Sequence, residues 1–544
     1  MKKRIKGVRA ACGLALLIGF QSCDDFLDIN TDPNNPLKST PALVLPTAQT
    51  VIFEALGNGS GGISDLTSQF VNQTVQRGPT NFYFVGGDEF SLSNAWQNLY
   101  AGALKDLDYI IEVSTEQESW HYLGVAQTLK AYTYSMLVDL WGKAVYSEFG
   151  KGTENPFASF NDGREVYQNV LLLLNEAAHN LAMDATVSPG TDDLVYKDIG
   201  QWIKFNNSLK LKLYNQVRLT DLYDADDVDA LIEADVMMAE VEDGFRLKYN
   251  ASNNPENRHP LYNQDYVQAN ANYIDPYFYL TMAGLSSPSV PNSPLGAITD
   301  PRIPYYFYNQ IETAEAPQNP PTSARFGPFL SIWFASFNID PNEGFDQSVS
   351  QTKVGLYPAG GAFDDGSAVM AGVAANQNPG HNGEGYTRLY PYFAHLYTRA
   401  ELSLTMGAAG DPRSLFEEAM YASFDEVNEI ASDAGVPEID EAAIDSYTGS
   451  VMGLFDGATD EEKLELIITE KWIATFGFTV DAYTDYRRTG YPVLFNPATD
   501  GNPFTILNRS YPVSLPYYIG DLQINPNADA QRNPGSERVF WDVN

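Results

Sequence analysis

Cysteine is the side chain in this sequence most able to form a covalent bond, and the 544-residue chain holds only two, Cys12 and Cys23. Cys23 follows an apolar run over 10–20, which itself follows a basic stretch made of Lys2, Lys3, Arg4, Lys6 and Arg9. This order is typical of a secretory signal segment, because the apolar run is too short to span a bilayer. Removal of residues 1–22 leaves Cys23 without an internal disulfide partner.

Residues 20–23, Phe-Gln-Ser-Cys, indicate lipid attachment at Cys23. They resemble a bacterial lipobox, in which a small residue precedes a cysteine that is acylated through its sulfur. Ser22 and Cys23 fit this pattern, whereas Phe20 stands where leucine is commonest and Gln21 where a small residue is usual. Two or more acyl chains anchor a protein stably. The sequence predicts a lipoprotein signal peptide over 1–22 and a lipidated tether over 23–40.

Aromatic side chains are the best candidates for ligand contact, because ring faces stack on sugars or on peptide side chains and tyrosine adds a hydroxyl. They gather in four short clusters outside the helices predicted below, at 82–84, 277–279, 305–307 and 333–334. The alternative is that each ring pads the core beneath a long loop. For ligand contact we select Phe82, Tyr83, Phe84, Tyr277, Tyr279 and Trp333.

No catalytic motif accompanies these clusters. The chain has no H-E-x-x-H, paired C-x-x-C, P-loop or G-x-S-x-G sequence, and its five histidines lack metal-ligand spacing. Asp340, Asn342 and Asp346 alternate as in a calcium loop, but Pro341 breaks the spacing and favours a solvated turn. We therefore predict no enzyme activity, no cofactor and no metal, although the many carboxylates leave a glycosidase-like acid pair open.

The charge of the chain argues against nucleic acid as a partner. The 33 Lys and Arg against 70 Asp and Glu give a formal charge of −37, with no basic stripe that could follow phosphates. Apolar residues make up 44% of the chain and aromatic residues 13%, which is typical of a folded globular protein. After the signal segment, no stretch is long and apolar enough to predict a transmembrane helix.

The elements that must position these residues are mostly helices. Apolar residues recur at helical spacing over 93–114 and 120–140, which predicts an αα-hairpin. Similar patterns predict helices over 164–182, 200–219, 388–408, 411–424 and 459–476. The last begins at Thr459 with Glu462 three residues on, a capping-box pattern.

The predicted fold class is mainly α, with TPR-like helical hairpins that form a scaffold for a loop-rich ligand-binding half. The loop-rich insertion covers about 245–380, where Pro, Gly, Asn and aromatic residues are frequent. We expect a single domain over 41–544.

Several motifs, taken in order, resemble the SusD/RagB outer-membrane lipoproteins of Bacteroidetes, in particular the SusD-like branch. Mature chains of that branch start near an N-T-D-P-N-N-P motif, which stands here at 30–36. The similarity runs nearly from end to end, through LYAGALKDLDYII at 99–111, AQTLKAYTYSMLVDLWGKAVYSE at 126–148, WIKFNNSLKLKLYNQVR at 202–218, EKWIATFGFTVDAYTDYRRTGYPVL at 470–494 and RSYPVSLPYYIGDLQINPNA at 509–528.

The resemblance implies a SusD-like helical fold and a nutrient-binding lipoprotein that is anchored to the outer membrane and faces the cell exterior. It implies an oligosaccharide or peptide ligand, and a SusC-like TonB-dependent transporter on which the protein sits as a lid. Asp24 and Asp25 resemble an export signal to the outer face, and Arg487 and Arg488 would close a helix and pair with acidic neighbours. No catalytic residue is carried over, and because ligand loops vary between members, the aromatic candidates inherit no role.

Two other functions stay open from the sequence. The protein could be mainly a structural or gating subunit of the transporter with few ligand contacts. A surface hydrolase is the third and least favoured class, since no catalytic motif supports it.

Overall fold

The structure, a computed structural model, describes most of the chain. It covers residues 39–59, 61–76, 83, 85–268, 271–312, 324–335, 350–367, 380–496, 500 and 510–543. The predicted signal peptide, Cys23 and the turn at 340–346 lie outside the described residues.

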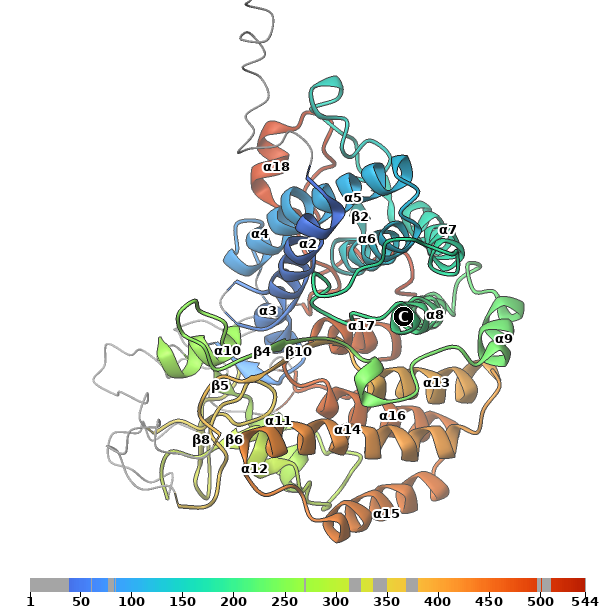
Figure 1. The fold of residues 1–544 in the computed structure, drawn as a ribbon. Coiled ribbons are helices and arrows are strands. Elements are labelled where there is room, and N and C mark those ends of the chain that lie inside the picture. Colours follow the sequence, from blue (N-terminus) through green and yellow to red (C-terminus); the bar gives the residue numbers. More distant parts are fainter. Residues whose placement is uncertain are drawn as a thin grey trace, which may run out of the picture.

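The amino-terminal part is a group of helices arranged around α6 (Trp120–Trp141), in the upper part of Figure 1. α6 is buried on nearly all sides, because it packs on both α5 (Lys105–Glu116) and α7 (Gly163–Leu181). A π-helical segment, η1 (Asn98–Leu104), interrupts the helix predicted over 93–114. The other helices of this part are α2 (Pro41–Leu56), α3 (Ile63–Phe70), α4 (Phe90–Gln97), α8 (Ile199–Gln216) and α9 (Ala225–Ala234).

The carboxy-terminal helices lie mostly in the lower part of Figure 1. They are α13 (Tyr392–Met406), α14 (Pro412–Ala434), α15 (Glu441–Gly457), α16 (Asp460–Ala474), α17 (Val480–Thr489) and α18 (Ile519–Ile524). α13 packs against α14 and α16. The capping box predicted for α16 is confirmed, since the Thr459 N–H donates to Glu462 Oε2 at 2.8 Å and Thr459 Oγ1 accepts from the Glu462 N–H.

The helix predicted over 388–408 begins too early. Residues Gly385–Tyr390 form strand β10, which pairs antiparallel with β4 (Phe245–Tyr249), and α13 starts only after Pro391. A proline disfavours helical backbone in the residue before it, and all six residues of β10 are buried. A fully buried strand has no polar face, so its pattern could not be told from a helix.

Short elements separate the two helical groups and make up the loop-rich half. They include the helices α10 (Pro260–Tyr262), α11 (Pro276–Ala283) and α12 (Ile303–Tyr306) and the π-helical η4 (Asn263–Val267). Antiparallel pairs join β1 (Thr74–Val75) to β5 (Tyr273–Ile274), β6 (Phe307–Tyr308) to β9 (Lys353–Val354), and β7 (Ala324–Phe326) to β8 (Phe329–Ser331). A further pair, β2 (Lys143–Ala144) with β3 (Asn161–Asp162), lies beside α6 and α7 in the amino-terminal part. The fold is thus mainly helical, as predicted.

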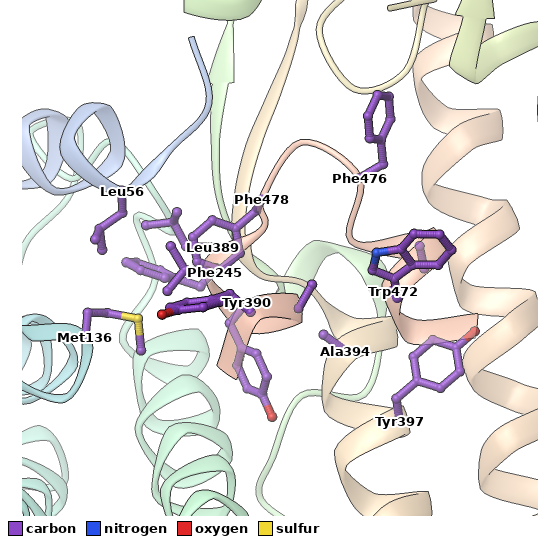
Figure 2. Close-up of a cluster of buried hydrophobic side chains, with 14 of the residues drawn as sticks. Leu56, Met136, Phe245, Leu389, Tyr390, Ala394, Tyr397, Trp472, Phe476 and Phe478 are labelled. Atoms are coloured by element: carbon purple, nitrogen blue, oxygen red, sulfur yellow. The ribbon is translucent and has the colours of Figure 1, made fainter. Parts of the chain in front are cut away.

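One large hydrophobic core connects the helical groups and the loop-rich half. Figure 2 shows part of it, in which Leu56 from α2 and Met136 from α6 lie near Phe245 and Tyr390 of the β4–β10 pair. The same cluster continues to Trp472 on α16. The two halves therefore share buried apolar surface, which is the main source of folding stability.

The two ends of the described chain meet in the interior. Thr67 Oγ1 on α3 is 2.7 Å from Thr479 Oγ1, next to α17, and the Gln73 side chain donates to the Trp472 carbonyl at 2.6 Å. The Trp541 indole donates to Asp139 Oδ1 on α6 at 2.8 Å. These contacts join residues about 400 positions apart, so early and late segments complete one another.

A buried ion network crosses the interface between α8 and the carboxy-terminal helices. Glu401 on α13 accepts from Arg488 and lies 3.1 Å from Arg218. Asp485 is 2.6 Å from Arg488 and 2.8 Å from Lys471. The same network includes Lys212 with Asp481, at 3.0 Å. All these side chains are nearly inaccessible to water, so each charge depends on its partner.

The role predicted for Arg487 and Arg488 is confirmed in part. Both lie in the last turn of α17, which ends at Gly490 with a left-handed φ of 81°. Arg488 pairs with acidic residues of the buried ion network. Arg487 differs, because it donates to backbone carbonyls, among them Asp139 O at 2.7 Å, and its guanidinium lies over the Tyr483 ring at 3.9 Å.

Candidate functional site

An aromatic band crosses the loop-rich half and brings together three of the four aromatic clusters that the sequence singled out. We define it by its rings, Tyr83, Tyr279, Phe326, Phe329, Trp333 and Phe334. Tyr279 stacks on Phe329 with centroids 4.0 Å apart, and Phe326 meets Trp333 edge to face at 6.0 Å. Phe334 continues to Tyr83 at 5.0 Å. Phe326 and Phe329 were missed by sequence reasoning, although they too are aromatic residues in the predicted loop region.

Local sequence explains why these rings meet. The strands β7 and β8 form a tight hairpin whose turn contains Gly327 with φ of 61°, a conformation that suits glycine. Phe326 and Phe329 are partners in this register, so both rings emerge beside each other. α11 begins at Pro276, and the Asp275 carboxylate accepts the Tyr277 N–H at 2.8 Å as an N-cap. The hairpin can then place Phe329 against Tyr279.

The selected residues differ in how a ligand could reach them. Tyr277 is 1% exposed, packs against Trp472 at 5.7 Å and donates its hydroxyl to the Val493 carbonyl, so it sits in the core. Tyr83 is also buried, and Trp333 is 8% exposed. Tyr279 keeps a partly exposed ring. Ligand contact stays a prediction for all of them, and Tyr279 is the best placed because its ring is partly exposed.

Phe82 and Phe84, the other two selected residues, lie outside the described residues. Their neighbour Tyr83 donates a hydrogen bond to the Phe495 carbonyl at 3.2 Å, and its ring also meets Tyr511 at 5.1 Å. The cluster at 305–307 touches the band through Phe307, whose ring meets Tyr279 edge to face at 5.5 Å. Tyr306 is fully buried and stacks on Tyr357 and Phe476, so its ring pads the core.

Comparisons with known proteins agree with this fold. The family model of starch-binding proteins that associate with the outer membrane matches residues 33–323, and that of SusD and RagB outer membrane lipoproteins matches residues 395–531. The chain belongs to the SusD/RagB family. The family consists of binding proteins rather than enzymes and is described as located at the outer membrane. No curated protein matches the chain.

Solved SusD/RagB structures share the fold at low sequence identity. A SusD homologue from Bacteroides fragilis has a TM-score of 0.66 at 18% identity, covering 93% of this chain and 99% of that chain. A SusD/RagB protein from Bacteroides thetaiotaomicron has a TM-score of 0.63 at 18% identity over the same shares. A chitin-binding SusD homologue from Flavobacterium johnsoniae has a TM-score of 0.62 at 17% identity, covering 92% of this chain and 99% of that chain.

The described part of this SusD/RagB chain contains no helix that is long and apolar enough to cross a membrane. It also contains no group of three or more His, Cys, Asp or Glu side chains arranged to hold a metal ion. His259 and His395 are core residues, and burial lowers the pKa of each imidazole to about 3.

A second aromatic-lined space in this SusD/RagB protein was not foreseen from the sequence. It is a cavity of about 280 Å³ beside α18, and its aromatic lining residues are Trp96, Tyr100, Phe149, Phe157 and Tyr518. We call it the α18 cavity. Trp96 and Tyr100 belong to the helical pattern predicted over 93–114, which does not indicate that they line a cavity. The other walls come from segments about 50 and 420 positions further along the chain, and no sequence signal joins them.

The capping carboxylate below the aromatic band gives a pH-dependent prediction. Burial raises the pKa of Asp275 to about 8, against the lowering effect of its bonds with the Tyr277 N–H and the Asn72 side chain. Because the pKa of Asp275 is higher in the folded than in the unfolded protein, its contribution to the free energy of unfolding is fully present below about pH 4. As the pH rises from there to about 8, this contribution declines by up to about 1.4 kcal/mol per pH unit.

Asp275→Asn should therefore flatten the loss of stability between pH 6 and pH 8. The new amide cannot ionise, its oxygen can still cap α11, and Asn72 Oδ1 has no hydrogen-bond partner within the described residues. Urea midpoints at pH 6, 7 and 8 measure the effect. Asp411→Asn, at the exposed cap of α14 where hydrogen bonds lower the pKa, is the matched control and should leave the slope unchanged. An unchanged slope in Asp275→Asn would refute the assignment.

Proposed function

We propose that this SusD/RagB protein is a cell-surface nutrient-binding lipoprotein that captures an oligosaccharide at the aromatic band. A peptide is the other ligand class compatible with stacking on rings. The observation that carries the proposal is the partly exposed Tyr279 held flat on Phe329, which fixes the orientation of a ring face at the edge of the loop-rich half. The starch-binding description of the family and a chitin-binding relative favour a glycan.

We further propose that the protein acts as the lid of a SusC-like TonB-dependent transporter. Ligand capture by stacking and hydrogen bonds would be followed by closure of the lid. Closure is favoured by ligand only if the closed state binds it more tightly than the open state. Fixed rings contribute to such a site at low entropic cost, because they are ordered before the ligand arrives.

Isothermal titration against a panel of glycans and peptides tests capture. Tyr279→Ala is expected to weaken binding roughly tenfold, about 1.4 kcal/mol, by removing a stacking face. Trp333→Ala is expected to weaken binding as well, by removing the ring that supports Phe326 in the band. Tyr279→Phe keeps the ring and should retain affinity. Tyr421→Ala, an exposed tyrosine on α14, is the distant control. Unchanged affinity in both alanine variants, with unfolding midpoints near wild type, would count against the band as the site.

The second candidate function is a structural or gating subunit of the transporter with few ligand contacts. The burial of Tyr83 and Trp333 is the observation that favours it, because a buried ring offers little surface to a ligand. A triple variant of Tyr83, Tyr279 and Trp333 to alanine separates the two functions. Uptake that survives in the triple variant and is lost on deletion of the whole protein supports the structural role.

The location of the protein is proposed on the sequence alone. Lipidation at Cys23 would hold it to the outer membrane, and Asp24 and Asp25 would direct it to the outer face. The chain would then consist of a removed signal peptide over 1–22, a lipidated tether over 23–40 and one SusD-like domain over 41–544 with its insertion at about 245–380.

A further inference from the structure

The α18 cavity is an apolar space with an unpartnered rim. α18 itself has no buried residue, and Ile524 on it is 72% exposed. Phe157, another lining residue, is 44% exposed. Large apolar side chains that face water around a concave surface favour an apolar occupant.

Several polar groups of the cavity walls are already hydrogen-bonded within the protein. The Trp96 indole donates to Asp521 Oδ2 at 3.1 Å, and the Tyr100 hydroxyl accepts the Val145 N–H at 2.8 Å. The Asn525 amide donates to the Ala158 carbonyl at 2.8 Å. A sugar needs several donors and acceptors from its site, whereas an apolar side chain needs none. The cavity therefore suits an aliphatic or aromatic side chain better than a glycan.

The segment between Cys23 and Ser39 contains apolar side chains that could occupy the α18 cavity. Between Cys23 and Ser39 the sequence is mostly Asp, Asn, Pro and Thr, but Phe26, Leu27 and Ile29 form an apolar group within it. In an extended chain Leu27 and Ile29 point to the same face. Asp24, Asp25 and Asp28 surround this group with negative charge.

The position at which the described chain begins places this segment within reach. The Ser39 carbonyl accepts a hydrogen bond from the Tyr109 hydroxyl at 2.9 Å. Tyr109 lies on α5, which continues η1, and η1 carries Tyr100 of the cavity wall. Nine residues of helix separate Tyr109 from Tyr100, about 13 Å along the axis. The ten residues from Ile29 to Ser39 can span roughly 33 Å, which exceeds that separation.

We propose that Phe26, Leu27 and Ile29 of the mature protein dock in the α18 cavity. What docking would do at the membrane rests on the lipidation at Cys23 that is part of the proposed function. With the segment docked, only three residues connect the lipidated cysteine to the protein body, about 10 Å of chain, in place of the roughly 50 Å available from Cys23 to Ser39. Docking would hold the body close to the membrane surface.

Hydrogen exchange on the full mature chain, carrying Cys23→Ser so that it is soluble without lipid, tests docking directly. In this parent protein, amides of 26–29 should exchange at least tenfold more slowly than in a free peptide of the same sequence. Replacing Phe26, Leu27 and Ile29 by serine should speed exchange of α18 amides at least threefold. Leu37→Ser, the remaining apolar residue of the segment, is the matched control and should leave α18 unchanged.

A substitution in the cavity wall tests docking from the other side, by its effect on hydrogen exchange of residues 26–29. Ala101→Trp, which fills the space from an exposed position on η1, should release 26–29 to the exchange rate of the free peptide. Free-peptide exchange of 26–29 in the parent protein would overturn the proposal. Protection of α18 that appears only on adding an oligosaccharide, or only at high protein concentration, would also overturn it and assign the cavity to a ligand or a second copy. Ligand titration of the triple-serine variant is independent, because the aromatic band lies elsewhere.

Discussion

Replacing Glu401 by alanine is expected to lower the free energy of unfolding by about 3–5 kcal/mol. Glu401 is fully buried, accepts from both Arg488 and the Asn215 amide, and lies 3.1 Å from Arg218. Its removal leaves two guanidinium groups without their shared carboxylate in a region that water does not reach. Urea unfolding of the mature protein, followed by far-UV circular dichroism, measures the change in midpoint.

The matched control for this substitution is Glu417→Ala. Glu417 also pairs with an arginine, Arg413 at 3.3 Å, but both side chains are exposed. Exposed ion pairs contribute about 0–1 kcal/mol, so this variant should unfold close to wild type. Equal midpoints for the two variants would show that the buried ion network does not hold α8 against the carboxy-terminal helices.

Replacing Cys23 by alanine is expected to release the protein from the membrane. The described residues offer no spanning helix, so attachment would rest on acyl chains at this one thiol, each buried CH₂ of which contributes about 0.8 kcal/mol. We expect the membrane-bound fraction to fall more than tenfold, and labelling by a radioactive or alkynyl fatty acid to be lost. Membrane fractionation of cells and fluorography measure the two effects.

Cys12→Ala is the control for the anchor, because Cys12 is the chain's only other cysteine and lies within the predicted signal peptide. It should retain both fatty-acid labelling and membrane attachment. Labelling that persists in Cys23→Ala would show that the acyl chain is carried elsewhere. Attachment that persists without label would show that the protein is held by its transporter instead.

The sequence predicted those helices whose buried face repeats clearly. The pattern over 164–182 corresponds to α7, in which Val166, Val170 and Leu174 face the core. The sequence did not predict α9, because Val228 is its only buried residue and apolar residues therefore hardly recur at helical spacing along it. The apolar pattern did not predict α17 for the opposite reason, since this helix buries charged residues of the ion network and its composition is that of an exposed segment. Only the family resemblance implied a helix closed by Arg487 and Arg488.

The candidate site was accessible to sequence reasoning only in part. Aromatic density located three of the clusters that meet in the aromatic band. Aromatic density does not indicate which rings are buried, because the same residue types pack in cores and contact ligands. Only its packing against Trp472 in the structure shows that Tyr277 is a core residue. The α18 cavity could not be foreseen at all, since its walls come from segments more than 400 positions apart.

The pairing of early with late segments has a consequence for how the chain acquires its structure. α3 and the residue Gln73 that follows it contact Thr479 and Trp472, so a chain that emerges amino terminus first must wait about 400 residues before these contacts can form. At about 5–20 residues per second, synthesis of that length takes roughly 20–80 s. During this interval the apolar face of α3 has no native partner on α17. A chain that lacks Thr479 and the residues after it cannot complete these contacts, so a carboxy-terminal truncation before Thr479 should yield aggregates rather than a smaller folded protein.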